Sequence, residues 1–444
     1  MNGLSEAKLE VVRRLIEQAP DAAVRNLLRA LQADGPHDVG LTRVQQLLEV
    51  EADDRNARNT ALAPIVALCA PSTELCGLDF PPRTLSLIWK ALKQEAPTAV
   101  AEAKATLHEW RRSDLPPEPF DALCAVAARG LRLAGGAFEA AAASADQGGG
   151  RQALAGCLDI APSTRAAMAQ MPLWLGRMTG ETSAKLRLIY RDVVCVDDDA
   201  GPRFFEMLTS HLGQPWQVLR VIAGVMDRPT DAYVAASELG VFGERVLADI
   251  DRRLDCIAGF RPTSGRQSAN EAARTLHLAT VEIAEIEQAF HLAPDGPWGA
   301  RTAKQKRRLA ETVDTLLLTA DRAVGQALPL HAVRLGPRTL KGVPQLTHDP
   351  DPAAVEKAAT LLTFIGEVRS SAPAGGFAAS RAKVLETLAL RLDTYVEDVL
   401  AEIHADDGAD IPRARAFLEI AADLCGLARD EKSAQIVRRR AAAA

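Results

Sequence analysis

Three aspartates near the C-terminal end of the sequence have the spacing of a metal-binding carboxylate motif. Asp406, Asp407 and Asp410 match the pattern D-D-x-x-D. Carboxylates spaced in this way can hold magnesium, because hard cations prefer oxygen ligands, and the bound metal can neutralise a diphosphate. The motif therefore predicts a metal or diphosphate site at these three residues, provided that a helix presents them together.

This motif is similar to the aspartate motif of helical prenyl-diphosphate and terpene synthases, but the neighbouring sequence departs from that family. Gly408 lies inside the motif and Pro412 directly follows it, which is typical of a loop. A second acidic motif of the type N-D-x-x-S-x-x-x-E is absent, and aromatic residues make up only 4% of the chain. We interpret the motif as an acidic loop, and keep a helical enzyme or ligand-binding protein with this site as the alternative.

A longer acidic segment contains the motif. Between residues 393 and 410 there is no lysine or arginine, and the acidic residues are Asp393, Glu397, Asp398, Glu402, Asp406, Asp407 and Asp410. Asp393 and Glu397 lie one helical turn apart, and Asp398 lies beside them. The segment is either a solvated helix face or a docking surface for a basic partner, for which Asp393, Glu397 and Asp398 are the candidate residues.

A second cluster of charged residues in the sequence is basic. Residues 301–308 contain five basic residues and no acidic one. The candidate interaction residues are Arg301, Lys304, Arg307 and Arg308; helical spacing places Arg301, Lys304 and Arg308 on one face with Arg307 beside it. The cluster predicts intramolecular pairing, an acidic protein partner or, as a further alternative, binding of an anionic polymer through residues 301–341. Because no aromatic residues are interleaved for base stacking, we do not expect nucleic-acid binding.

Sequence signatures of catalysis are otherwise absent. We find no phosphate-binding loop, nucleophile elbow, dinucleotide fingerprint or H-E-x-x-H pair. Ser5–Lys8 and Ser380–Lys383 match S-x-x-K, but both lie where helices are predicted to begin, so we interpret the serines as N-caps. We expect no cofactor.

Composition places the chain among globular proteins. Of its 444 residues, 48% are hydrophobic and 25% are charged, and the formal net charge of −6 excludes a strongly basic nucleic-acid binder. The seven cysteines form no C-x-x-C pair and are expected to be buried thiols. No signal peptide and no apolar run long enough to span a bilayer are visible, so we predict a cytoplasmic protein. The Ala-, Arg- and Leu-rich composition is typical of a high-GC bacterium.

The elements that would position these residues are predicted to be helices. Apolar residues recur with the spacing i, i+3, i+4, i+7, as at Leu85, Ile88, Trp89 and Leu92, which indicates amphipathic helices. Past the basic cluster, an apolar stripe continues through Leu309, Val313, Leu316 and Leu317. Because no alternating pattern typical of paired strands is found, we predict an all-α fold, either an elongated multi-helix bundle or an irregular α-helical hairpin solenoid.

Breaks in the helical pattern suggest three regions. The glycine-rich segment 148–150 and the proline- and glycine-rich segment 326–351 are the longest interruptions. We predict an N-terminal helical region 1–147, a middle helical region 151–260 and a C-terminal helical region 261–444 that contains the irregular insert 326–351. From these features we expect a non-catalytic scaffold or adaptor that binds protein partners or self-associates.

Overall fold

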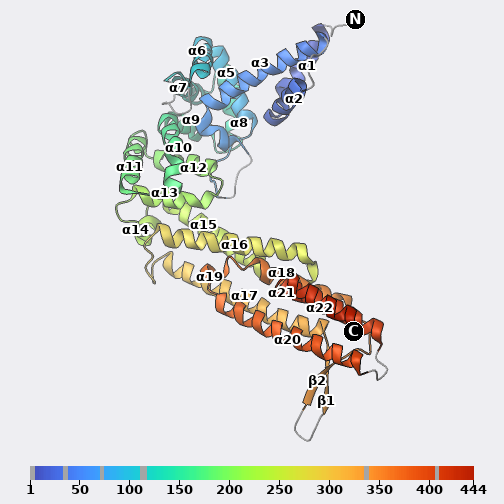
Figure 1. Ribbon diagram of the computed structural model, residues 1–444. Helices are drawn as coiled ribbons and strands as arrows, with labels where there is room; N and C mark the ends of the chain where they lie inside the picture. Colours follow the sequence, from blue (N-terminus) through green and yellow to red (C-terminus); the bar gives the residue numbers. More distant parts are fainter. Residues whose placement is uncertain (1–5, 34–38, 71–74, 111–117, 335–339, 406–409) are drawn as a thin grey trace. The chain divides into compact units, whose positions relative to one another are not determined.

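The computed structural model describes residues 6–33, 39–70, 75–110, 118–334, 340–405 and 410–444. Within these residues the chain forms 22 α-helices, four short 3₁₀ helices and one two-stranded β-sheet, which confirms the predicted all-α fold (Figure 1). In this described part, no helix is both long enough and apolar enough to cross a bilayer. The chain divides into two compact units, Met1–Arg228 and Pro229–Ala444.

The first unit is built from helices of 4 to 23 residues. Prolines in the first turn open several of them, since the missing N–H has no partner to lose there. The helices are α1 (Glu6–Gln18), α2 (Asp21–Ala33), α3 (Val39–Ala61), α4 (Ala63–Val66), α5 (Arg83–Glu95), α6 (Pro97–Glu109), α7 (Glu118–Leu133), α8 (Glu139–Ala145), α9 (Arg151–Asp159), α10 (Ala161–Leu175), α11 (Gly180–Val194), α12 (Ala200–His211) and α13 (Val218–Val225), with 3₁₀ helices at Ala67–Cys69, Gly136–Phe138 and Pro215–Gln217.

Helices α1, α2 and α3 share a small hydrophobic core. Only Ile16, Val24 and Leu48 in this cluster are buried, and partly buried side chains pack around them. Three buried side chains contribute roughly 1.5–3 kcal/mol each, or about 5–9 kcal/mol together. Because ordering the backbone of three helices costs more than this, further contacts are needed to hold them together.

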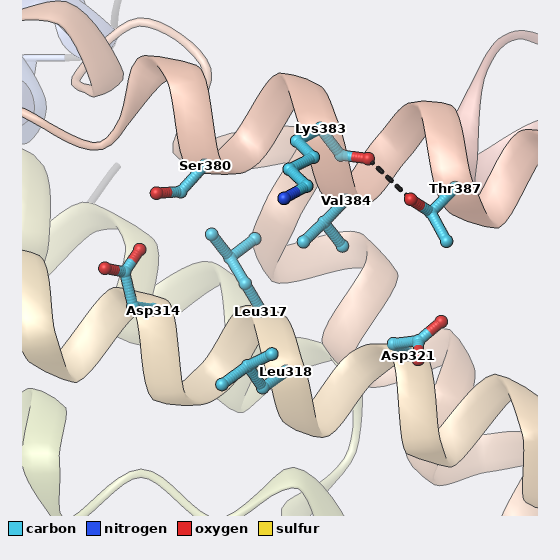
Figure 2. Close-up of a pocket in the computed structure, with 8 residues that line it drawn as sticks. All are labelled: Asp314, Leu317, Leu318, Asp321, Ser380, Lys383, Val384 and Thr387. Carbon is cyan, nitrogen blue, oxygen red and sulfur yellow. Dashed lines mark hydrogen bonds between the residues drawn. The ribbon is translucent and has the colours of Figure 1, made fainter.

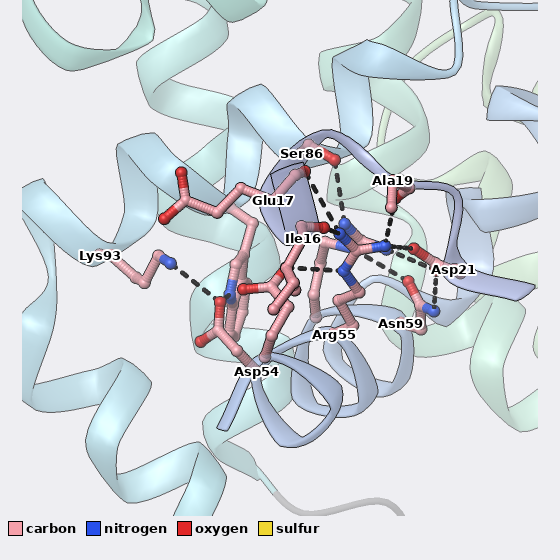
Figure 3. Close-up of polar contacts among 12 residues, drawn as sticks. Ile16, Glu17, Ala19, Asp21, Asp54, Arg55, Asn59, Ser86 and Lys93 are labelled. Carbon is pink, nitrogen blue, oxygen red and sulfur yellow. Dashed lines mark hydrogen bonds and ion pairs between the residues drawn. The ribbon is translucent and has the colours of Figure 1, made fainter. Parts of the chain in front are cut away.

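Arg55 of α3 provides those contacts (Figure 3). Its guanidinium donates hydrogen bonds to the carbonyl oxygens of Ile16 and Ala19, each at 2.7 Å, near the C-terminus of α1. It also forms an ion pair with Asp21, the first residue of α2, at 2.9 Å. Burial alone would raise the pKa of Asp21, but hydrogen bonds from Asn59 and Arg58 outweigh it and lower the pKa. One side chain thus joins the end of α1 and the start of α2 to α3.

A second charged centre joins α3 to α5 and α6. The buried carboxylate of Asp54 accepts hydrogen bonds from Trp89 Nε1 at 3.0 Å and from Lys93 Nζ at 2.8 Å, and it also accepts one from Lys104. Burial opposes ionisation of Asp54, but the two lysines outweigh burial and hold its pKa below the usual value. The carboxylate is therefore ionised at neutral pH and stabilises the contact of three helices.

The remainder of the first unit packs around large buried side chains such as Phe120 and Trp174. Arg165 of α10 lies over the Phe120 ring and donates hydrogen bonds to the carbonyl oxygens of Thr60 and Ala61, at 2.8 and 2.7 Å. These two carbonyl groups lie at the C-terminus of α3, where no backbone N–H of the helix is left to bond them. A buried arginine again supplies the hydrogen-bond donors.

The glycine-rich break at 148–150 lies inside this first unit. The backbone N–H of Gly149 donates a hydrogen bond to the carbonyl of Asp79 at 2.9 Å, and Gly150 adopts a φ of 91° before α9 begins. The boundary between the two compact units falls between Arg228 and Pro229. The division into regions 1–147, 151–260 and 261–444 stays a prediction.

The second unit contains the longest helices. Its elements are α14 (Asp231–Ala235), α15 (Gly240–Ala258), α16 (Arg266–Ala289), α17 (Gly299–Ala327), α18 (Pro352–Glu367), α19 (Ala372–Gly375), α20 (Ala378–His404), α21 (Ile411–Ala428) and α22 (Glu431–Ala443), a 3₁₀ helix at Pro262–Ser264, and strands β1 (Leu330–Arg334) and β2 (Leu340–Pro344). Helix α18 packs against α16, α17 and α21, and its face towards them is apolar, with Phe364 completely buried.

A tightly held turn sets the start of α17. The carboxylate of Asp231 accepts hydrogen bonds from the backbone N–H groups of Ala293 and Gly299, at 3.4 and 3.2 Å. Trp298 is completely buried just before the helix, and its ring lies so close to Gly243 that a Cβ at this glycine would approach it to 2.3 Å. The turn therefore positions the first residues of α17, including the predicted basic cluster.

The segment 326–351 differs from the sequence-based expectation. The sequence predicts an irregular segment and no paired strands, yet β1 and β2 form an antiparallel hairpin in which Leu330 pairs with Pro344 and Arg334 with Leu340. The strands are five residues long and contain few β-branched residues, so they give little periodic signal. Two-stranded sheets of this kind depend on neighbouring structure, here the contact of β2 with α20.

Replacing Arg55 with alanine should release α1 and α2 from α3. The variant leaves the carbonyls of α1 and the carboxylate of Asp21 without their common donor, at a cost of about 3 kcal/mol. Hydrogen–deuterium exchange should show faster exchange in residues 6–33, whereas the rest of the unit exchanges as before. Alanine at Arg25, an exposed arginine of α2, serves as the control and should change little. Equal protection in both variants would contradict the role of Arg55.

Candidate functional site

A groove lies between α17 and α20 in the second unit. It has a volume of about 370 Å³ and is lined by Asp314, Leu317, Leu318, Asp321, Ser380, Lys383, Val384 and Thr387 (Figure 2). The two helices run in the same direction, so Asp314 faces Ser380 at one end and Asp321 faces Thr387 at the other. Leu317, Leu318 and Val384 form an apolar strip in the middle of the groove, where Lys383 also lies, and the two ends are polar.

Buried contacts on either side of the groove hold the two helices in place. Leu316 and Leu317 of α17 are buried, as are Leu388 and Leu392 of α20. Arg391 of α20 donates a hydrogen bond to the carbonyl oxygen of Asp321 at 2.7 Å and forms an ion pair with its carboxylate at 3.0 Å. The groove is therefore a feature of two anchored helices and does not need a ligand to form.

The apolar part of the groove is open to solvent. Leu317 lies at its base with 1% of its surface exposed, whereas the neighbouring Leu318 is 59% exposed. Val384 completes the apolar strip from the side of α20. The exposed leucine and the strip beside it are apolar surface that a bound molecule would remove from water.

The polar groups of the groove differ in how they are paired. The Oδ1 atom of Asp314 is buried and has no hydrogen-bond partner among the described residues. Lys383 is exposed, and within the described part of the chain its ammonium forms no ion pair. The Thr387 hydroxyl donates to the carbonyl oxygen of Lys383 at 2.9 Å. Asp314 and Lys383 are therefore charges that a bound molecule could pair.

The interpretation of Ser380 as an N-cap is wrong. Helix α20 begins at Ala378, its N-cap is Phe377, and no side chain accepts a capping hydrogen bond there. Ser380 is instead the third residue of the helix and faces the groove, with Lys383 one turn further along. Ser5, the other serine of an S-x-x-K match, lies outside the described residues.

Two of the four predicted interaction residues of the basic cluster pair within the second unit. Arg301 forms ion pairs with Asp251 and Glu244 of α15, at 2.7 and 2.9 Å, and Arg308 pairs with Asp255 of the same helix.

Lys304 and Arg307, by contrast, point outwards as exposed residues of α17. The predicted common face of Arg301, Lys304 and Arg308 is thus divided, since the two arginines pair with carboxylates of α15 and Lys304 is exposed.

The predicted acidic residues also have partners from elsewhere in the chain. Asp393 pairs with Arg429 at 2.6 Å, Glu397 with Arg440 at 2.7 Å, and Asp398 with Lys341 of β2 at 3.0 Å. These contacts connect α20 to the end of α21, to α22 and to the hairpin. The negative charge of this face is therefore largely offset inside the molecule.

The structure leaves the D-D-x-x-D motif largely undescribed. Asp406 and Asp407 lie outside the described residues. Asp410 is the N-cap of α21, where its carboxylate accepts a hydrogen bond from the backbone N–H of Arg413 and also pairs with the Arg413 guanidinium at 3.1 Å. Among the described residues, no group of three or more His, Cys, Asp or Glu side chains is arranged to hold a metal ion.

A buried pair of carboxyl groups lies between α15 and α16. Asp249 is 4% exposed and Glu282 is 0% exposed, and both accept hydrogen bonds from Nε of Arg253, at 3.1 and 3.0 Å. Burial, together with the negative charge of Asp249, raises the pKa of Glu282 to about 8. Protonated Glu282 can donate its proton to Asp249. Because Glu282 has no exposed surface, we interpret this pair as part of the packing.

Comparison with known proteins finds no significant match. No family model matches the sequence, and neither the search of curated proteins nor the search of solved structures gives a match. The groove, its charges and its exposed leucine are therefore the basis for a functional proposal.

Sequence reasoning did not identify Asp314, Leu318 and Lys383 as site residues. Leu318 carries one recognisable signal, since it directly follows the predicted buried stripe of Leu309, Val313, Leu316 and Leu317, all of which are buried in the structure. An apolar residue next to such a stripe lies on a different helix face. The pairing of this face with α20 depends on tertiary contacts that no local pattern contains.

Glutamine at position 282 should remove a pH dependence from the second unit. In the unfolded chain a glutamic acid ionises near its ordinary pKa of 4.5, whereas folded Glu282 keeps its proton up to about pH 8. The wild-type unit should therefore lose stability as the pH rises from about 5 to 8, by about 1.4 kcal/mol per pH unit from this group. The glutamine retains a donor for Asp249 without ionising, so the variant should be the more stable protein at pH 8.

The measurement is hydrogen–deuterium exchange of peptides from α15 and α16 between about pH 5 and 8.5, corrected for the intrinsic pH dependence of exchange. Glutamine at Glu271, an exposed residue of α16, is the matched control and should keep the wild-type profile. The same pH profile in wild type and Glu282→Gln would show that Glu282 is ionised in the folded protein.

Proposed function

We propose that this protein is a non-catalytic helical adaptor and that the groove between α17 and α20 holds a segment of a partner protein. The observation that carries the proposal is Leu318, which is 59% exposed beside the apolar strip formed by Leu317 and Val384. Burying this leucine and the strip under a partner would remove apolar surface from water, which is the main driving force of protein association.

The form of the groove favours a helical or extended segment as its occupant. Its lining residues span two turns on each of two parallel helices, from Asp314 to Asp321 and from Ser380 to Thr387. A helix that lies in a groove between two others is bound through apolar residues spaced at i, i+3 or i+4, and i+7. Because α17 and α20 are anchored to each other, the groove itself loses little conformational entropy when the segment binds.

The charges outside the groove support an electrostatic role for part of the predicted basic cluster. Arg301 and Arg308 are engaged with α15, which leaves Lys304 and Arg307 on the exposed surface of α17. They precede Asp314 by ten and seven residues, or roughly 15 and 10 Å at 1.5 Å per residue. We propose that they steer an acidic part of the partner towards the groove, an effect that salt would weaken.

The acidic face has a different role in this proposal. Asp393, Glu397 and Asp398 hold other elements of the second unit through their ion pairs. Reversing their charges would disturb folding as well as binding, so they are poor positions at which to test an interaction. Lys304 and Arg307 are suitable positions, because glutamate there leaves the described ion pairs intact.

Aspartate at Leu318 should abolish partner capture. The tagged full-length protein would be isolated from its own host after crosslinking, and bound proteins identified by mass spectrometry. The wild type should retain a stoichiometric partner crosslinked near α17 and α20, and Leu318→Asp should lose it, because a carboxylate in the apolar strip would have to be desolvated.

Aspartate at Leu188 is the matched control, since this leucine of α11 is 53% exposed and lies in the first unit. It should capture the same partner as the wild type. Light scattering of the purified protein separates a foreign partner from a second copy of the chain. Equal partner capture by the wild type and Leu318→Asp would contradict the proposed role of the groove.

A further inference from the structure

The two unpaired charges of the groove define the chemistry of its occupant. Asp314 is half-buried on α17, and its Oδ1 atom is buried without a hydrogen-bond partner among the described residues. A buried acceptor without a donor is unfavourable, because the water that solvated it in the unfolded chain has been removed. Asp314 also lines the groove and forms no ion pair among the described residues, so a cationic side chain beside it would pair with the half-buried carboxylate.

Lys383 is the complementary group on the opposite wall. It lies one helical turn beyond Ser380, which faces Asp314 across the groove (Figure 2). Within the described part of the chain, no ion pair joins Lys383 to Asp314, although both residues line the groove. The groove therefore presents a negative charge at one end and a positive charge about one helical turn along its axis, with the apolar strip beside them.

At the far end of the groove, the two polar side chains are already engaged. The carboxylate of Asp321 pairs with Arg391, and the Thr387 hydroxyl bonds to a backbone carbonyl. Charge recognition can thus come only from the half of the groove that contains Asp314 and Lys383. The opposite half offers apolar contact and a neutral rim.

We propose that the groove selects an amphipathic partner helix that carries a basic and an acidic residue one turn apart beside its apolar face. This inference rests on the proposed function and specifies the partner. The basic side chain lies against Asp314, the acidic side chain lies against Lys383, and apolar side chains cover Leu317, Leu318 and Val384. Charges placed in this way orient the helix and discriminate against partners that match the groove only in hydrophobicity.

The test uses two fluorescent, alanine-rich helical peptides with identical leucine positions and the full-length protein. One peptide carries a lysine and a glutamate one turn apart beside the leucines, and the other carries glutamine at both places. Fluorescence anisotropy should show that the wild type binds the charged peptide roughly tenfold more tightly than the neutral one, as expected for a partly buried ionic hydrogen bond. Higher salt should reduce this preference.

Two variants that each remove one charge test whether Asp314 and Lys383 cause the preference for the charged peptide. Asp314→Asn and Lys383→Gln should each reduce the affinity for the charged peptide by roughly threefold and leave the affinity for the neutral peptide unchanged. Glu271→Gln, at an exposed position of α16 that does not line the groove, is the control and should leave the preference between the two peptides intact.

The outcomes separate this inference from the proposed function. If both peptides bind the wild type equally and Leu318→Asp abolishes both, the groove binds helices without selecting their charge, and the inference is overturned while the function stands. A preference for the charged peptide that survives in Asp314→Asn and Lys383→Gln overturns the inference as well. Absence of binding by either peptide overturns it too, and the proposed function then rests on the capture experiment alone.

Discussion

The C-terminal ends of its helices are where this all-α chain depends most on hydrogen-bond donors from other parts of the fold. The last carbonyl groups of each α-helix have no backbone donor, and a chain built almost entirely of helices contains many such ends. Arginine side chains from other helices supply the donors at several of them. Arg55 reaches the end of α1, Arg165 the end of α3, Arg220 the end of α10 and Arg187 the end of α13.

In the second unit, Arg381 bonds in the same way to the carbonyl of Ile365 in the last turns of α18. A guanidinium suits this role because its donors spread in a fixed plane and its charge favours the negative end of the helix dipole. The same arginine often forms an ion pair with a carboxylate as well, so that it holds both the C-terminus of one helix and a residue of a neighbouring element. A chain with 4% aromatic residues thus uses arginine where larger rings could have filled space.

This use of charge explains what could be predicted from the sequence and what could not. The helices and their buried faces follow from local spacing, as Leu309, Val313, Leu316 and Leu317 demonstrate, because burial of a helix face imposes its own period. The pairing partners of the charged clusters cannot be predicted from local spacing. Arg301 pairs with Asp251, and Asp393 with Arg429, only after helices distant in the sequence pack together. Similarly, the short strands of the hairpin carry no period that local reasoning detects, and the groove exists only where α17 meets α20.

The buried carboxyl pair of Asp249 and Glu282 has a consequence for the protein in solution. Because the pKa of Glu282 is raised to about 8, the folded chain holds at neutral pH a proton that the unfolded chain releases. The native molecule is therefore one charge less negative than its formal value of −6. Folding takes that proton from the surrounding buffer, so the heat measured on unfolding includes the buffer's own ionisation enthalpy and differs between phosphate and Tris at the same pH.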